Sequence, residues 1–148
     1  MKVAIGSDER THLTDVVIDD LRKRGYEVET IGPLAGQVAY WPDVAIEVGK
    51  RVASGTADEG ILLCWTGTGV SIAANKIPGV RAALCWDAET ARGAKKWDGA
   101  NVLCMSLRYT SEIVAKEILD AWLNTREIDP TEVANIEKVK SLDEHRRL

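Results

Sequence analysis

The segment CWTGTGVSIAANK, residues 64–76, places a thiol, hydroxyls and glycines at the end of an apolar run. Glycines allow backbone N–H groups to approach a ligand closely. A helix that starts here adds unpaired N–H donors and a partial positive charge. Such a segment can bind an anion, which would be a phosphate, a carboxylate or a transient oxyanion. The same field favours the thiolate form of Cys64.

A thiolate beside N–H donors suits two reactions. One is nucleophilic attack on a carbonyl, and the other is removal of a proton next to a carbonyl, with the enediolate held by the N–H groups. The two histidines are His12, which we place on a helix surface, and His145, which we place in a solvated tail. A Cys–His nucleophile is therefore not expected. On spacing alone, Gly67 and Gly69 are equally compatible with a loop that merely turns the chain.

Short apolar runs alternate with helical patterns along the whole chain. We expect strands at 2–6, 26–31, 60–64, 81–85 and 101–104, and helices at 10–24, 43–54, 69–77, 88–96, 111–124 and 131–145. Short, continuously apolar strands are typical of a parallel sheet that is buried between two helix layers. The sequence therefore predicts one α/β domain, residues 1–148, in the form of a three-layer sandwich.

Ligands of such sheets bind beyond the carboxyl ends of the strands, where the winding direction reverses. We expect the strand order 2-1-3-4-5, in which the first and third strands are neighbours. The loops 6–10 and 64–69 then meet, so Asp8 and Cys64 should face one crevice.

Composition excludes several classes of function. The net charge is -4 and there is no long basic run, so nucleic acid is not expected as a partner. No apolar run reaches the roughly 18 residues of a membrane helix, and the N-terminus does not resemble a signal peptide. We expect a cytoplasmic protein without a metal or cofactor. Cys85 and Cys104 also end apolar runs, and we interpret them as small buried hydrophobic residues.

Four motifs together resemble one enzyme family. They are KVAIGSD at 2–8, WPD at 41–43, ILLCWTGTGVSIAANKIPGVRAAL at 61–84 and ANVL at 100–103. They are similar to the type B ribose-5-phosphate isomerases, a family that includes the galactose-6-phosphate and allose-6-phosphate isomerases. The likeness covers roughly residues 1–123, and its long central motif is specific.

The resemblance implies a Rossmann-like fold and a homodimer, or a tetramer built from dimers, with active sites at the subunit interface. The last helix, about 131–145, would reach over the partner. The implied activity is metal-independent aldose–ketose isomerisation of a sugar or sugar phosphate through a cis-enediol, as in pentose phosphate metabolism.

The resemblance also implies roles for individual residues. Cys64 is the base that moves the proton between C1 and C2, and Thr66 assists as a hydroxyl. The implied substrate-binding residues are Asp8, Glu9, Trp65, Gly67, Thr68, Gly69, Ser71, Trp97, Asp98 and Arg108. Among the matching positions, Ser71, Asn75, Lys76 and Arg81 are interpreted mainly as shaping the loop and helix.

The departures from the family pattern fall at positions that handle the sugar ring and the phosphate. Glu9 stands where relatives have His. Trp97-Asp98 replaces a His-Asn pair whose histidine opens the sugar ring, usually in the partner's site. The stretch 131–135, TEVAN, replaces two arginines and a histidine that bind the phosphate. Glu9 and Glu132 would instead repel a phosphate dianion.

Three hypotheses remain. The first is an isomerase that keeps the Cys64 chemistry on an unphosphorylated or short-chain sugar. The second retains ribose 5-phosphate, with Arg10, Arg108 or Arg126 in a rebuilt phosphate site. The third is a non-catalytic sugar-binding or partner subunit. Four tryptophans near the crevice either stack on a neutral sugar or pack a dimer interface: Trp41, Trp65, Trp86 and Trp97.

Overall fold

The computed structural model describes residues 1–147, with side chains described for residues 1–144, so the prediction for His145 lies outside the described side chains. Five strands form one parallel sheet: β1 Lys2–Ser7, β2 Glu27–Ile31, β3 Glu59–Cys64, β4 Ala82–Leu84 and β5 Val102–Ser106. The α-helices are α1 His12–Lys23, α2 Trp41–Ala53, α3 Thr68–Ala74, α4 Ala88–Asp98, α5 Glu112–Asn124 and α6 Val133–Ser141.

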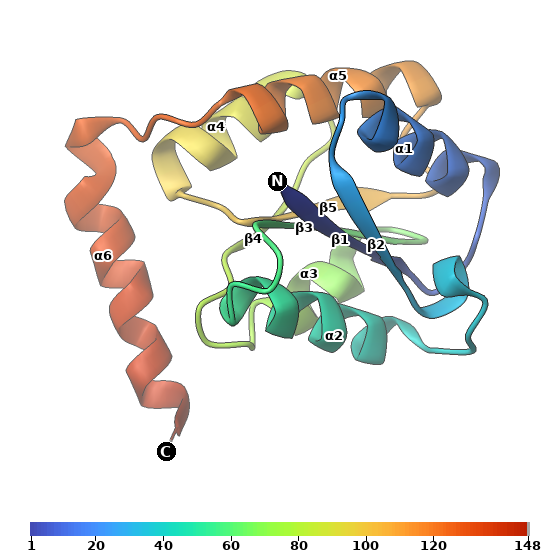
Figure 1. Ribbon diagram of the computed structural model, residues 1–148. Coiled ribbons are helices and arrows are strands. Elements are labelled where there is room, and N and C mark those ends of the chain that lie inside the picture. Colours follow the sequence, from blue (N-terminus) through green and yellow to red (C-terminus); the bar gives the residue numbers. More distant parts are fainter. Residues whose placement is uncertain (148) are drawn as a thin grey trace.

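The sheet is covered by helices on both faces, as predicted. Helices α1, α4 and α5 lie on one face, and α2 and α3 lie on the other (Figure 1). Successive strand residues point to opposite faces. In β1, Val3 and Ile5 pack under the first helix layer, whereas Ala4 packs under the second. This double burial explains why the strands are continuously apolar.

The expected order of the last two strands was wrong. The observed order is β2-β1-β3-β5-β4, with β5 paired to β3 and β4 at the edge. All five residues of β5 are buried, whereas the three residues of β4 are only partly buried. The longer strand, whose residues are all buried, takes the central position because both of its faces are covered there.

Several helix bounds also differ from the predictions. Helix α2 begins at Trp41, two residues early, with Pro42 in its first turn, where a missing N–H costs nothing. Helix α4 continues to Asp98 and ends at Gly99, which has the left-handed backbone of a helix cap. The expected helix 131–145 is divided into 3-10 turns at Pro130–Glu132 and Leu142–Arg147 and the helix α6 between them.

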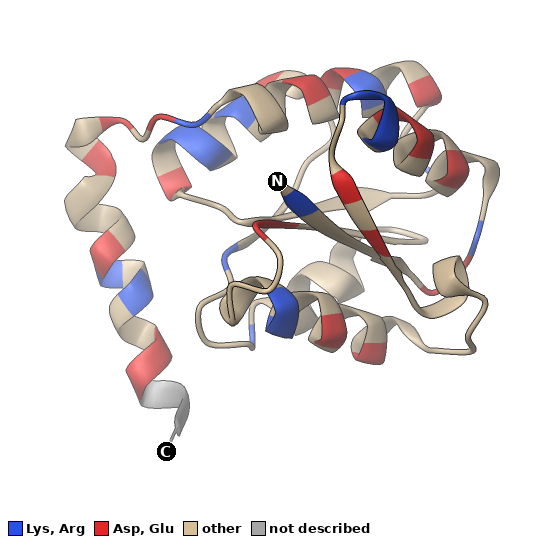
Figure 2. Ribbon diagram, in the orientation of Figure 1, with Lys and Arg blue, Asp and Glu red and all other residues tan. Residues whose placement is uncertain are grey.

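Helix α6 stands apart from the sheet, beside the C-terminal end of α4 (Figure 1). Its buried residue is Ile136, which packs near Gly99. Acidic and basic residues are interspersed along the outer helices (Figure 2). Within residues 1–147, no helix is long and apolar enough to cross a membrane.

Candidate active site

Three loops meet at the carboxyl edge of the sheet because β1, β3 and β5 are neighbours. A cavity of about 280 Å³ lies there. It is lined by Asp8, Trp41, Cys64, Trp65, Thr66, Thr68 and Gly69. The structure thus places Asp8 and Cys64 in the wall of one cavity, at the strand pair where the winding direction reverses.

The loop after Cys64 is held by the loop after β5. The N–H of Leu107 donates to the Cys64 carbonyl at 2.9 Å, and the N–H of Arg108 donates to the Trp65 carbonyl at 3.1 Å. The Ser106 hydroxyl also donates to the Trp65 carbonyl, at 2.9 Å. In a trans peptide the N–H points opposite to the C=O. The N–H groups of Trp65 and Thr66 therefore point away from the β5 loop.

The two glycines of this loop are required for different reasons. Gly67 has φ +78°, and a Cβ there would lie 2.6 Å from Leu84 Cδ1 and 2.9 Å from the Met105 carbonyl carbon. Both its backbone and its surroundings therefore exclude a side chain. Gly69 has an ordinary helical backbone, but a Cβ there would lie 3.0 Å from Trp41 Cε3. Gly69 is needed by the indole that packs on it.

The three thiols differ in their surroundings. Burial raises the pKa of Cys85 to about 12, and it raises the pKa of Cys104 well above its ordinary value. Both are therefore protonated and inert near neutral pH. Cys64 is also mostly buried, but it lines the cavity with Asp8 and Thr66. Thiolate chemistry at this cavity thus depends on Cys64.

A second cavity of about 410 Å³ shares Thr66 with the first and is also lined by Trp86, Ser106 and Arg108. The Arg108 guanidinium lies 5.7 Å from the centre of the Trp65 ring. The Thr66 and Thr68 hydroxyls lie 2.7 Å apart. The Arg108 guanidinium therefore lies in the cavity that adjoins the Cys64 cavity at Thr66. The corrected strand order places it there, because β5 is the neighbour of β3.

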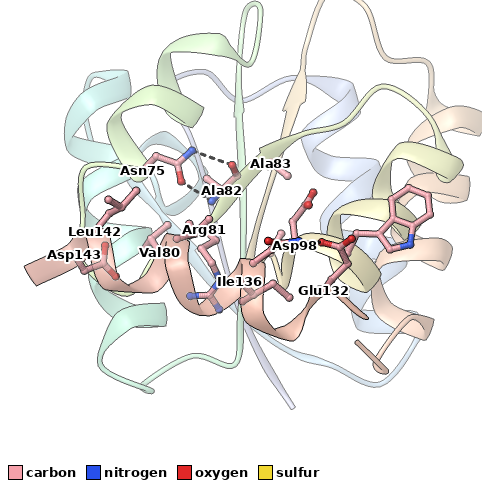
Figure 3. A pocket seen from close by; sticks show the side chains of 14 residues that line it. Asn75, Val80, Arg81, Ala82, Ala83, Asp98, Glu132, Ile136, Leu142 and Asp143 are labelled. Carbon is pink, nitrogen blue, oxygen red and sulfur yellow. Dashed lines mark hydrogen bonds between the residues drawn. The ribbon is translucent and has the colours of Figure 1, made fainter. Parts of the chain in front are cut away.

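Trp97 and Asp98 do not join Cys64 within the chain. Helix α4 runs back from the carboxyl edge to the amino edge of the sheet, and these residues form its last turn. They line a different cavity of about 370 Å³ beneath α6, together with Arg81, Glu132 and Asn135 (Figure 3). The residues at the positions to which the resemblance assigns ring opening and phosphate binding thus gather in one place, away from their own chain's Cys64.

In this second place, the charge of Glu132 acts on the Asp98 carboxyl. Partial burial, followed by the negative charge of Glu132, raises the pKa of Asp98. In the family pattern that the sequence resembles, Asp98 stands in place of Asn, and Glu132 lies in the stretch that replaces the phosphate-binding arginines and histidine. The two carboxylates make this surface unfavourable for a phosphate dianion.

Other predicted residues lie outside the Cys64 cavity. Glu9 is exposed and does not line it, and its N–H donates a hydrogen bond to the Ser7 hydroxyl oxygen at 3.2 Å. Ser71 lies on α3 and does not line it either. Arg10 pairs with Asp15, and Arg126 donates to the Leu123 carbonyl. Of the arginines considered for a phosphate, Arg108 is the one beside the cavity.

Ser106 was not predicted as a site residue, and Trp41 was predicted only as one of four tryptophans near the crevice. Trp41 lines the cavity, and Ser106 holds the Cys64 loop through the Trp65 carbonyl. Ser106 carried a usable signal, since it is a polar residue at the end of an apolar strand, as Cys64 is. Trp41 carried a weaker one, the aromatic residue before a proline that begins a helix.

Comparisons with known proteins agree on one family. The chain matches Ribose/Galactose Isomerase over residues 3–141. Ribose-5-P isomerase B of Listeria innocua is 32% identical over 148 residues, which cover 99% of this chain and 100% of that protein. D-erythrulose-4-phosphate isomerase of Pectobacterium atrosepticum is 34% identical over 141 residues, which cover 94% and 93%.

A solved structure agrees with these matches. Ribose-5-Phosphate Isomerase B of Clostridium thermocellum superposes with a TM-score of 0.91 at 36% identity, covering 98% of this chain and 99% of that one. The match extends across the sheet, both helix layers and the segment after α5. The chain belongs to the Ribose/Galactose Isomerase family.

Proposed function

We propose that this aldose–ketose isomerase uses Cys64 as its base and acts on a short sugar that reacts in its open-chain form. The isomerase class follows from the family. The observation that supports the proposed mechanism is the position of the Cys64 thiol, in a cavity wall beside Asp8 and the backbone of residues 65–69.

The reaction needs a base, a place for negative charge and a hydroxyl proton carrier. The Cys64 thiolate removes the C2 proton of the aldose, and the electron pair moves onto the carbonyl oxygen to give an enediolate. The N–H groups of Trp65 and Thr66 stabilise that oxyanion. The Thr66 hydroxyl carries the proton from O2 to O1, and the thiol returns its proton to C1 to give the ketose.

A short substrate is favoured because the ring-opening group of the family is absent from this chain. Trp97 offers no imidazole, and the ring of His12 pairs with Glu112 on the surface, outside the Cys64 cavity. A four-carbon aldose with a substituted C4 hydroxyl cannot close a five-membered ring, so it needs no ring-opening step. The similarity to a D-erythrulose-4-phosphate isomerase is consistent with this.

The terminal group of the substrate is placed toward Arg108. The second cavity continues from Thr66 and holds that guanidinium, which pairs well with a phosphate. By contrast, Asp98 and Glu132 repel a phosphate near α6. A phosphate at Arg108 therefore requires a chain short enough to end there.

The test is solvent deuterium incorporation, measured by NMR, into aldoses and ketoses of four to six carbons with and without a terminal phosphate. Label should enter four-carbon sugars fastest. Cys64→Ala should abolish exchange, whereas Cys85→Ala, which removes a thiol from the neighbouring cavity, should retain it. Full activity in Cys64→Ala would refute the proposed base. Absence of label in every sugar would favour a non-catalytic sugar-binding subunit.

A further inference from the structure

Trp41 forms a wall of the cavity that holds Cys64. It is the first residue of α2, and Pro42 follows it in the first helical turn. Its side chain is 42% exposed, so part of the indole remains open to a ligand. The other lining residues carry the thiol, the carboxylate, the hydroxyls and the backbone of the loop. Within this cavity, Trp41 and Trp65 provide the large apolar surfaces.

The indole of Trp41 is held in place by Gly69. A methyl group at Gly69 would lie 3.0 Å from Cε3, 3.1 Å from Cζ3 and 3.2 Å from Cδ2 of Trp41. These three atoms belong to the six-membered ring, which therefore lies directly against the Gly69 backbone. The backbone conformation of Gly69 is one that any residue can adopt. The contact with Trp41 is therefore possible because Gly69 lacks a side chain.

We propose that Trp41 determines substrate specificity: seated on Gly69, its indole stacks on the C–H face of the sugar and limits the chain length that fits beside Cys64. The inference rests on the proposed function and goes beyond it, since it names the side chain that selects short sugars. Aromatic faces bind apolar C–H groups through burial and dispersion. The contact with the Gly69 backbone prevents the Trp41 indole from moving aside for a longer sugar chain.

The first experiment compares kcat/KM for a four-carbon and a five-carbon substrate of the same terminal group. Trp41→Ala should raise the ratio of the five-carbon to the four-carbon value by about tenfold, the scale set by small changes in a binding pocket. Trp41→Phe should give a smaller rise. A loss of folded protein lowers both values together and leaves the ratio unchanged, so the ratio isolates specificity.

The matched control is Tyr40→Ala. It removes an exposed aromatic ring from the residue next to Trp41, and Tyr40 lines neither the Cys64 cavity nor the Arg108 cavity. The ratio should stay at its wild-type value in this variant. An equal change in both variants, or an unchanged ratio in Trp41→Ala, would overturn the inference.

The second experiment tests the contact between Trp41 and Gly69. Gly69→Ala should push the indole into the cavity and lower kcat/KM for the four-carbon sugar by about tenfold. In the Trp41→Ala background, the same substitution should cost less than about threefold, because the partner in the contact is gone. Equal losses in both backgrounds would show that Gly69 does not act through Trp41.

The outcomes separate this inference from the function on which it rests. If the wild-type protein exchanges label with none of the sugars, both are refuted. If it exchanges label normally and the length ratio is unmoved by Trp41→Ala, only the role of Trp41 is refuted.

Discussion

At the scale of single residues, the three cysteines lie in or next to apolar strands but have different surroundings. Cys64 lines the cavity that holds Asp8, and Cys104 has no exposed surface. Burial raises the pKa of the Cys85 thiol to about 12. The sequence shows that all three residues are cysteines, but the differences between their surroundings depend on how the folded chain packs around each one.

Alkylation should distinguish these thiols. With a small reagent such as iodoacetamide at neutral pH, we expect Cys64 to be modified first, because burial raises the pKa of the Cys85 and Cys104 thiols and keeps both protonated. Peptide mass spectrometry after a time course gives the order of modification. Cys64→Ala is the control and should slow total labelling. Modification of Cys85 or Cys104 at the rate of Cys64 in folded protein would contradict this.

The Asp98 carboxyl should respond to its neighbour. Since the charge of Glu132 contributes to its raised pKa, Glu132→Gln should lower the pKa of Asp98 toward the ordinary value. A carboxyl with a raised folded-state pKa contributes stability below its unfolded pKa and loses that contribution as pH rises through its folded pKa. The variant should therefore lose less stability over that interval.

Carboxyl carbon chemical shifts in an NMR titration give the pKa directly. Glu137→Gln, on α6 and paired with Lys140, is the control that should leave Asp98 unchanged. An unchanged pKa of Asp98 in Glu132→Gln would show that the two carboxylates do not interact.

At the scale of secondary-structure elements, one buried ion pair connects β3 with two helices. Glu59 of β3 pairs with Lys95 of α4, and its other oxygen accepts a hydrogen bond from the Trp122 indole of α5 at 3.0 Å. Lys95 also lies 5.0 Å from the centre of the Trp122 ring. Burial raises the pKa of Glu59, although Lys95 and Trp122 oppose the rise. The pair orients α4, whose last turn carries Trp97.

Removing one partner should be costly. Lys95→Met leaves Glu59 with a buried, uncompensated charge, which destabilises a fold by about 3 kcal/mol. The loss should shrink as pH falls, because protonation of Glu59 removes the charge. Urea unfolding at several pH values measures this. The neighbouring Lys96→Met, at an exposed position, should change stability little, and an equal loss there would contradict the argument.

The sequence predicted the elements better than their arrangement. Hydrophobic periodicity located every strand and the helices of the two layers, because burial on one face leaves a local pattern. The pattern of β4 and β5 does not say which of them lies beside β3, since both are short apolar runs. Their order depends on which strand has both faces covered in the folded sheet.

The site shows the same division. Asp8 and Cys64 were predicted together because Asp8 follows one strand and Cys64 ends another, and both strands end at the same edge. Trp97 and Asp98 were assigned by resemblance, and the direction of α4 carries them to the opposite edge. Trp41 was recognised as an aromatic residue near the crevice, but its contact with Gly69 depends on how α2 packs on α3.

At the scale of the whole molecule, we propose that α6 and the residue after it contact a second copy of the chain. Val133, Val139 and Leu142 are each about half exposed, although Ile136 between them is buried. The acidic surface beneath α6 also lies away from the chain's own Cys64. Both features are explained if α6 reaches over a partner, as the resemblance implies.

Light scattering on a size-exclusion column should give a mass of twice 16.2 kDa, or four times for a tetramer. Val139→Glu should weaken this assembly, because it places a charge in an apolar contact. Lys138→Glu, on the same helix, is the control for charge alone. A single chain at all concentrations would refute the shared interface.

The positions of the tryptophans allow their fluorescence to report ligand binding and unfolding separately. Trp122 has no exposed surface, whereas the other four tryptophans are between 42% and 62% exposed. A shielded indole emits at shorter wavelength than a hydrated one. A dissolved quencher should therefore reduce the fluorescence of the four exposed tryptophans and leave the emission of Trp122. A sugar that shields Trp41 and Trp65 would reduce quenching, while the red shift of Trp122 would report unfolding separately.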